Sequence, residues 1–359
     1  EMGWVVSINP HTGLEDWSVR IGATNRSTPT VEEGMIFLTG GADQTLYALD
    51  INNGNIIWSK HLGQAAVYEA PLYRDGVLYV GSGLDTNANV FAFTAATGDL
   101  IWKKELGGEA FFGGALGDDY LYVGTYIGQT MYALNLEDGS EVWKKFMPGY
   151  GFAAKPVVEG NDLFANVSNF DLGTGALYVF DAATGEVKYT VSNIGDTQAS
   201  SPIIFEDIVV IGSATQPLLK AFNRENGQLL WENRLVGTAY NNGSISANGL
   251  LFVTGLGGNF YIIDVYTGEV LKDYTLPNFS YSNIPVLPGM VIVPYRRGIQ
   301  AYVSHGTITG HITDTNGNSL NGKVQIMESL ESTFADESGK YSLEHVPGDY
   351  TIMASYYGK

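Results

Sequence analysis

The sequence contains no cysteine among its 359 residues. Disulfides, thiolate chemistry and cysteine-ligated zinc or iron–sulfur centres are therefore excluded. No run of eighteen apolar residues is present, so the sequence predicts no transmembrane helix. Basic residues are scarce, because 19 lysines and arginines stand against 38 aspartates and glutamates, which gives a formal net charge of −19. A surface this acidic repels phosphate backbones and anionic bilayers, which argues against nucleic-acid and membrane-surface roles.

One sequence motif recurs seven times along the chain at near-constant spacing. Its fixed glycine falls at positions 13, 54, 98, 139, 185, 227 and 268, so successive copies lie 41, 44, 41, 46, 42 and 41 residues apart. In each copy an alternating apolar stretch leads to an Asp, Asn or Thr that can hydrogen-bond the coming turn, and the glycine then supplies a positive φ. A period in the low forties with about four strands is the length of one propeller blade. The sequence therefore predicts an all-β propeller.

A large aromatic residue follows the glycine by four positions in six of the seven copies. Such residues could serve as sugar platforms, but a fixed phase in the repeat favours rings that dock between adjacent blades and bury a large aromatic area. The last copy has Lys272 at this position, so the sixth full blade should be the least regular. The structural aromatic residues are Trp17, Trp58, Trp102, Trp143, Tyr189 and Trp231.

The number of blades follows from counting strands. Six copies have all four strands, the N-terminus supplies only the last two of a blade, and Ser282–Val303 supplies two and a candidate third. Joining these ends completes a seventh blade and removes exposed sheet edges. One strand is left over, because Val5–Asn9 and Ile299–Val303 compete for the third position. We predict a seven-bladed propeller over residues 1–304, with eight blades as the alternative.

The loops that lead into the first strand of each blade are in register, so they should meet at one mouth of the central channel. Aromatic residues appear in five of the seven loops, with amide and hydroxyl side chains between them, and such a lining suits a peptide segment or a glycan. Packing of the same rings inside the channel is the alternative interpretation. The residues predicted to bind a partner here are Arg26, Tyr68, Glu69, Phe111, Phe112, Tyr150, Phe152, Tyr240, Asn241, Phe279 and Tyr281.

No catalytic constellation stands out in the sequence. The five histidines lie in unlike contexts, which favours turns and strand ends over a metal site. The segment that starts at Asp314 and continues through Asn316 and Asn318 begins like a calcium loop, but it lacks the distal glutamate, which favours a turn. We therefore predict no catalytic residue, no cofactor-binding residue and no metal ligand.

The repeated pattern Ala-x-Asp-x-x-Thr-Gly-x-x-x-Trp, seen at Ala48, Asp50, Gly54 and Trp58, resembles the PQQ-like repeat. That repeat is shared by quinoprotein alcohol dehydrogenases and by the propeller lipoprotein of the outer-membrane β-barrel assembly machine. The resemblance implies the fold over roughly residues 1–304. Quinoprotein dehydrogenases typically carry a disulfide of adjacent cysteines against the cofactor, and this chain has none. A PQQ-dependent, calcium-assisted oxidoreductase is therefore the alternative to a binding protein.

The sequence changes character after Gly306. The order Gly310-x-Ile312-x-Asp314, then Asp336-x-x-Gly339-x-Tyr341, then a Val-Pro-Gly turn resembles a carboxypeptidase-regulatory-like domain, a small transthyretin-like β-sandwich. Short alternating runs at Lys323–Met327, Lys340–Leu343 and Tyr350–Ala354 agree with that resemblance. We predict a second domain at 305–359 that holds only part of such a sandwich. Domains of this family are common accessory modules of secreted and surface proteins.

The leading hypothesis is a non-enzymatic propeller, secreted or attached to the cell surface or envelope, that recognises a protein or polysaccharide at the aromatic mouth. The chain opens on Glu1-Met2 without a signal-like segment, which fits a mature secreted form or a shortened one. The second domain would act as a spacer or attachment module. A purely architectural ring in a surface layer is a third hypothesis.

Overall fold

The computed structural model describes residues 2–23, 28–41, 43–65, 70–83, 88–108, 111–152, 154–169, 171–197, 200–213, 218–235, 244–245, 248–255, 257–280, 283–304, 306–327, 331–345 and 351–356. These residues form strands, turns and bends without a helix, so the predicted all-β class is confirmed. Within the same ranges there is accordingly no helix of the length and apolarity needed to cross a membrane. The chain divides into unit 1, Glu1–Asn283 with Tyr295–Arg297, and unit 2, Ile284–Pro294 with Gly298–Lys359.

Six four-stranded antiparallel sheets make up most of the described part of unit 1, and we call them blades 1 to 6. The strands of each blade pair in chain order, so every blade is a meander joined by tight turns. Blades 1 to 3 are β3 (Thr30–Glu32), β4 (Met35–Thr39), β5 (Thr45–Asp50), β6 (Ile56–His61); β7 (Leu72–Arg74), β8 (Val77–Ser82), β9 (Asn89–Thr94), β10 (Leu100–Glu105); and β11 (Phe111–Leu116), β12 (Tyr120–Thr125), β13 (Thr130–Asn135), β14 (Glu141–Phe146). Blades 4 to 6 are β15 (Val157–Glu159), β16 (Asp162–Asn169), β17 (Thr174–Asp181), β18 (Val187–Ser192); β19 (Ile203–Phe205), β20 (Ile208–Gly212), β21 (Leu218–Asn223), β22 (Leu229–Arg234); and β23 (Ser244–Ile245), β24 (Leu250–Gly255), β25 (Asn259–Asp264), β26 (Val270–Thr275).

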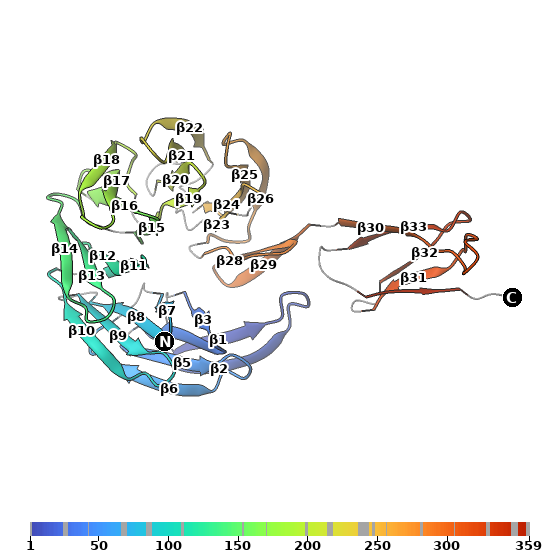
Figure 1. The fold of residues 1–359 in the computed structure, drawn as a ribbon, viewed down its shortest axis with the longest axis horizontal. Coiled ribbons are helices and arrows are strands. Elements are labelled where there is room, and N and C mark those ends of the chain that lie inside the picture. The colour runs from blue at the N-terminus through green and yellow to red at the C-terminus, as the bar shows by residue number, and fades with distance from the viewer. Residues whose placement is uncertain are drawn as a thin grey trace. The chain divides into compact units, whose positions relative to one another are not determined.

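The blades stand around a common centre, with the first strand of each innermost and the fourth outermost (Figure 1). Strand β7 contacts both β3 and β11, and β11 contacts β15. Neighbouring blades bury their faces against each other: Tyr79 and Trp102 of blade 2, for example, pack with Leu121 and Leu134 of blade 3. The middle strands are covered on both faces by neighbouring sheets, which is why their sequences are apolar at successive positions.

A hairpin of β1 (Met2–Ile8) and β2 (Glu15–Ala23) precedes blade 1. Ile21 of this hairpin packs against Ile36 and Leu49 of blade 1, as a further blade would. At the other end of unit 1, Asn283 follows blade 6 and donates its side-chain amide to the hydroxyl of Thr28, just before blade 1, at 3.1 Å. The two ends of the six-blade array are therefore in contact, in agreement with a β-propeller.

The described residues of unit 2 form three small sheets. One sheet consists of β27 (Val286–Leu287), β28 (Met290–Tyr295) and β29 (Gly298–Val303). These correspond to the two strands and the candidate third strand predicted within Ser282–Val303. The others are β30 (Gly306–His311) paired with β33 (Lys340–His345), and β31 (Lys323–Ile326) flanked by β32 (Ser332–Phe334) and β34 (Ile352–Ser355). Ile312, Val324 and Ala335 form a small core that these last two sheets share.

Candidate functional site

The two ends of each blade are built differently. One end, which we call the turn face, carries the turns between the first and second strands and the glycine turns between the third and fourth strands. The other end, the loop face, carries the connections between the second and third strands and the loops that pass from blade to blade. The mouth predicted from the sequence belongs to the loop face.

An aromatic ring joins each blade to the next at the turn face. The ring lies directly against the repeated glycine of the following blade: a Cβ atom added to Gly54 would lie 2.5 Å from the ring of Trp17. The Nε1 or Oη atom of the ring donates a hydrogen bond to the main-chain carbonyl of the residue just after the capping Asp, Asn or Thr. The polar atom of the ring is therefore paired even though the ring packs between blades. These bonds are Trp17 Nε1 to Ile51, Trp58 to Ala95, Trp102 to Leu136 and Trp143 to Ala182, each 2.9 Å, Trp231 to Val265 at 2.8 Å, and Tyr189 Oη to Arg224 at 2.5 Å. These six aromatic residues act between the blades and not as an open platform.

Polar side chains join the blades at the loop face instead. Between blades 1 and 2, Asn89 donates its side-chain amide to the Gln64 carbonyl oxygen at 2.6 Å. Between blades 4 and 5, the Ser168 hydroxyl donates to a carboxylate oxygen of Asp196 at 2.7 Å. Every polar side chain that is buried among the described residues lies at or beside this face: Thr39, Ser82, Asn89, Thr125, Thr130, Asn166, Ser168, Asp196, Thr197, Ser200, Ser213, Thr254 and Ser280.

Much of the predicted mouth falls outside the described residues. This applies to Arg26, Tyr68, Glu69, Tyr240, Asn241 and Tyr281, and to the side chains of Phe111 and Phe112, whose backbone belongs to β11. Their predicted role therefore stays a prediction.

Three predicted residues of the mouth are described with their side chains. Phe152 is only 1% exposed and packs in the core between blades 3 and 4, so the expectation that its ring lines an open surface is corrected. Tyr150 is half-buried at the edge of the same core. The half-buried ring of Phe279 lies under the guanidinium of Arg296, 5.5 Å from the ring centroid, which fills one face of the ring with a cation–π contact.

The inner hairpin of blade 4 departs from the repeat. Strands β16 and β17 have eight residues each, whereas the equivalent β24 and β25 of blade 6 have six, and the added length lies at the loop face. Pairing continues to Asn169 and Thr174, so the hairpin extends as a β-ribbon, which we call the finger (residues 166–177). Insertions in one repeat commonly mark the binding face of a repeat protein. The 46-residue step between the glycines at 139 and 185 is the trace of this insertion in the sequence.

Hydrogen bonds hold the finger in place. Asn169 donates its side-chain amide to the Gly149 carbonyl at 2.7 Å and accepts the main-chain N–H of Leu172 at 3.1 Å. Gly151 pairs with Ser168 through two main-chain hydrogen bonds of 2.9 Å. The described residues of the finger are therefore anchored to the loop between blades 3 and 4.

The finger and its neighbouring loops expose large apolar side chains at the loop face. Leu172 at the tip is 70% exposed, Phe146 at the end of β14 is 61% exposed, and Ile127 after β12 is 56% exposed. The loops that carry them are tied together, because Gln129 accepts the main-chain N–H of Gly149 through its side chain at 2.9 Å. We call Ile127, Phe146, Tyr150 and Leu172 the finger patch. Grouped exposed apolar side chains of this kind mark interaction surfaces.

A buried carboxylate lies at the root of the finger. Asp196 is 4% exposed, and Ser168, which donates to it, also accepts the main-chain N–H of Thr197 at 3.1 Å. Burial raises the pKa of the nearby Tyr126 hydroxyl, and the charges of Asp196 and then Asp171 raise it further. Two carboxyl groups, those of Asp196 and Asp171, therefore act on this part of the loop face.

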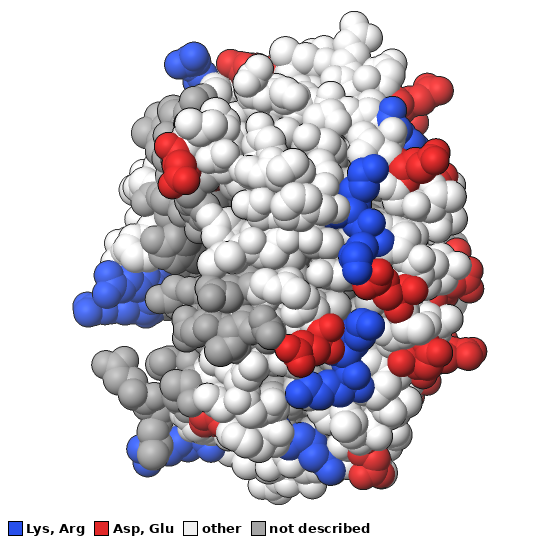
Figure 2. Space-filling model, turned by 90° about the vertical axis from the view of Figure 1, so that its left-hand side faces the viewer, with Lys and Arg blue, Asp and Glu red and all other residues white. Residues whose placement is uncertain are grey.

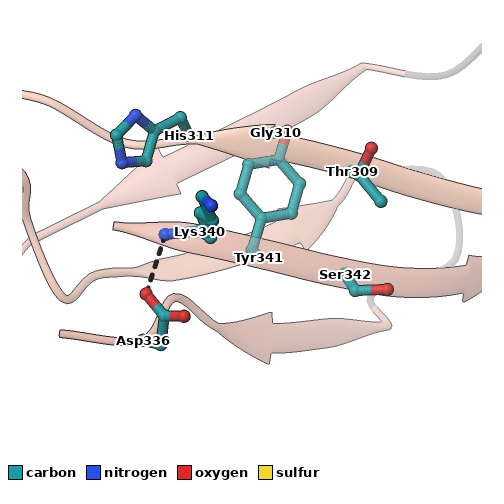
Figure 3. Close-up of a pocket in the computed structure, with 7 residues that line it drawn as sticks. All are labelled: Thr309, Gly310, His311, Asp336, Lys340, Tyr341 and Ser342. Carbon is teal, nitrogen blue, oxygen red and sulfur yellow. Dashed lines mark hydrogen bonds between the residues drawn. The ribbon is translucent and has the colours of Figure 1, made fainter. Parts of the chain in front are cut away.

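Unit 2 offers a second candidate, a shallow pocket on the β30–β33 ribbon lined by Thr309, Gly310, His311, Asp336, Lys340, Tyr341 and Ser342. The Tyr341 ring lies across Gly310, and a main-chain N–H of Lys340 reaches Asp336 (Figure 3). Asp336 also accepts the Ser338 hydroxyl and main-chain N–H, which lowers the pKa of its carboxyl. The Asp336 carboxylate in this pocket is therefore used to stabilise the turn at residues 336–340. No three His, Asp or Glu side chains gather as metal ligands anywhere in the described ranges.

The calcium-like segment at Asp314 is also used by a turn. Its carboxylate accepts the main-chain N–H groups of Asn316 and Asn318, both at 2.8 Å, and the side-chain amide of Asn318 at 2.9 Å. These donors lower the pKa of the Asp314 carboxyl and occupy both of its oxygens. The segment therefore adds no candidate site.

Comparison with known proteins places the repeat in a family. A family model described as outer membrane protein assembly factor BamB matches residues 1–110 and 86–293. Two similar proteins are the tetrathionate hydrolase of Acidithiobacillus ferrooxidans, 24% identical over 274 residues (68% of this chain, 52% of that protein), and BamB of Moranella endobia, 21% identical over 285 residues (74% and 63%). The chain thus spans about half to two-thirds of the length of these relatives.

Solved structures agree on the fold. BamB from Moraxella catarrhalis has a TM-score of 0.65 at 19% identity and covers 83% of this chain and 88% of its own. Quinohemoprotein alcohol dehydrogenase from Comamonas testosteroni has a TM-score of 0.65 at 14% identity, covering 81% and 67%. At these identities the likeness shows the fold alone, which confirms the quinoprotein-like propeller. With a family model that matches most of its length, the chain belongs to the family of the outer membrane protein assembly factor BamB.

Proposed function

We propose that this chain is a non-catalytic scaffold of the cell envelope that binds a protein partner through the finger patch at the loop face. The observation that carries the proposal is the lengthened hairpin of blade 4, which exposes Leu172 and is tied by a hydrogen bond to Gly149, in the loop that follows exposed Phe146. Gly149 is tied in turn to Gln129, two residues after exposed Ile127. An apolar surface of this kind gains binding free energy when a partner covers it. Membership of a family named for an outer membrane assembly factor supports both the scaffold role and the envelope location.

The opposite end of the blades supports the choice of face. The turn-face acids Glu137, Glu159 and Glu186 are exposed. Figure 2 shows acidic residues along one edge of unit 1, with a strip of Lys and Arg beside them, and further Lys and Arg at the opposite edge. An apolar patch can be desolvated at lower cost than a surface rich in carboxylates.

We further propose the finer architecture. The β1–β2 hairpin would supply the outer strands of a seventh blade and residues 282–303 its inner strands, with either β1 or β29 as the third strand. Residues 305–359 would be a carboxypeptidase-regulatory-like sandwich that serves as a spacer, and the small core around Val324 supports this.

The enzyme alternatives have less support. PQQ held by calcium needs a group of oxygen or nitrogen ligands, and the described residues offer no such group of His, Asp and Glu, while the chain has no cysteine. The described residues therefore give no support for that cofactor. No feature of the described residues points to the chemistry named for the tetrathionate hydrolase, of which the chain spans 52%.

Selection of peptides tests the proposal. A random dodecapeptide display library is selected on the immobilised chain, and the retained peptides are tested on two double variants. Leu172→Ser with Phe146→Ser removes the patch, and Leu100→Ser with Ile101→Ser is the matched control, because those side chains are similarly exposed at the turn-face end of β10. Peptides lost only on the patch variant are expected. Repeated selections that yield none would refute the proposed function.

A further inference from the structure

The charge next to the finger patch indicates the kind of partner it fits. Asp171 adjoins Leu172 at the tip of the finger, is exposed, and takes part in no ion pair with any described residue. A carboxylate held beside an apolar side chain on a fixed turn can form an ion pair with a partner at the moment when apolar contact excludes water.

A second carboxylate strengthens the field at this place. Asp196 lies at the root of the finger, and it and Asp171 both act on the hydroxyl of Tyr126, so both carboxylates lie near one point of the loop face. Asp196 is held in its place by Ser168, at 2.7 Å, so the position of its carboxyl group is fixed. An exposed carboxylate beside an apolar side chain attracts a cation.

The two lysines of β14 next to Phe146 are directed away from the patch or paired elsewhere. Lys145 precedes Phe146 in β14, and successive residues of a strand point to opposite faces, so its side chain leaves the patch. Lys144 is paired with Glu141, at 3.1 Å, toward the turn face.

We propose that the finger patch receives a polypeptide segment in which a lysine or arginine lies next to a large apolar side chain. The apolar side chain packs against Leu172 and Phe146, and the cation pairs with Asp171. This inference rests on the proposed function, because it names the partner chemistry of the same surface. Tight turns and edge strands of a partner protein present such neighbouring pairs of residues.

The peptides selected on the finger provide the test. We expect patch-dependent peptides to be enriched in Lys or Arg within two positions of Leu, Ile, Phe or Trp. Asp171→Asn, which keeps the shape of the side chain, should weaken the binding of a representative labelled peptide about fivefold at about 50 mM salt, and this difference should vanish near 0.5 M salt. Glu137→Gln at the turn face is the matched control and should leave the affinity unchanged.

The outcomes separate this inference from the function beneath it. Patch-dependent peptides without basic residues, or equal binding by wild type and Asp171→Asn at low salt, would overturn the inference and leave the protein-binding scaffold standing. Absence of any patch-dependent peptide would overturn both. Finger-dependent retention of a polysaccharide on a glycan array, with no peptide retained, would replace the polypeptide with a sugar partner.

Discussion

Replacing Trp102 by alanine should cost about 4 kcal/mol of unfolding free energy. The indole is 7% exposed, so nearly all of its apolar surface of about 200 Å² is buried, worth about 5 kcal/mol by area. Residual compactness of the unfolded chain reduces this to about 3–4 kcal/mol. The hydrogen bond from Nε1 to the Leu136 carbonyl, 2.9 Å long, adds about 1 kcal/mol. Trp102→Phe keeps most of the area but not the hydrogen bond, and should cost about 1–2 kcal/mol.

The assay is urea unfolding followed by far-ultraviolet circular dichroism, which does not depend on the fluorescence of the tryptophan removed. Trp4→Ala is the control, because Trp4 is 62% exposed on β1 and should cost less than about 1 kcal/mol. Equal losses for Trp102→Ala and Trp4→Ala, with unchanged m-values, would refute the view that these indoles join the blades.

Three further predictions concern the same framework. Gly185→Ala should cost about 2–3 kcal/mol in urea unfolding, because its φ is +72° and the new Cβ would lie 2.6 Å from the ring of Trp143, whereas Gly160→Ala, with φ +59° and open space, should cost only about 1 kcal/mol. Burial raises the pKa of Tyr122 to about 12 from 10.0, so its neutral form is favoured in the folded state. The stability that Tyr122 contributes should be complete below pH 10 and should disappear as the pH rises toward about 12. Tyr122→Phe should therefore flatten this part of a profile of the urea midpoint against alkaline pH. An unchanged profile would contradict the assignment. Incubation with PQQ and calcium should give no quinone absorbance bound to the chain and no dye reduction, and a clear signal would reverse the choice against an oxidoreductase.

The blades were predictable because one short sequence motif determines both the turn within each blade and the contact with the next. A turn glycine, a capping side chain before it and an indole after it repeat in phase, and each has one physical role that the neighbouring copy completes. Trp58, for example, packs against the glycine of blade 2 and donates to a carbonyl of the same blade. A signal that recurs seven times at a nearly fixed step specifies the fold even though each single copy is weak.

The finger patch could not be predicted in the same way. Leu172, Phe146 and Ile127 are ordinary apolar residues whose exposure depends on how far one hairpin extends past its neighbours. The aromatic residues that looked most informative include Phe152, which is buried, because an aromatic ring in a loop serves core and surface equally well. The sequence held one usable clue, the longest step of the repeat, and that step indicates an insertion without saying on which end of the blade it lies.

The different construction of the two blade ends explains why the insertion in blade 4 lies at the loop face. At the turn face the ring, the glycine and the carbonyl must meet within a few tenths of an ångström, as the 2.5–2.9 Å contacts of the added Cβ positions show, so an insertion there would separate two blades. At the loop face two junctions use different polar pairs, Asn89 with Gln64 and Ser168 with Asp196. A junction that has no fixed pattern can absorb two extra residues in each strand and re-form its hydrogen bonds around them, as blade 4 does. A propeller fastened in this way keeps its architecture through one end and is free to acquire binding surfaces at the other.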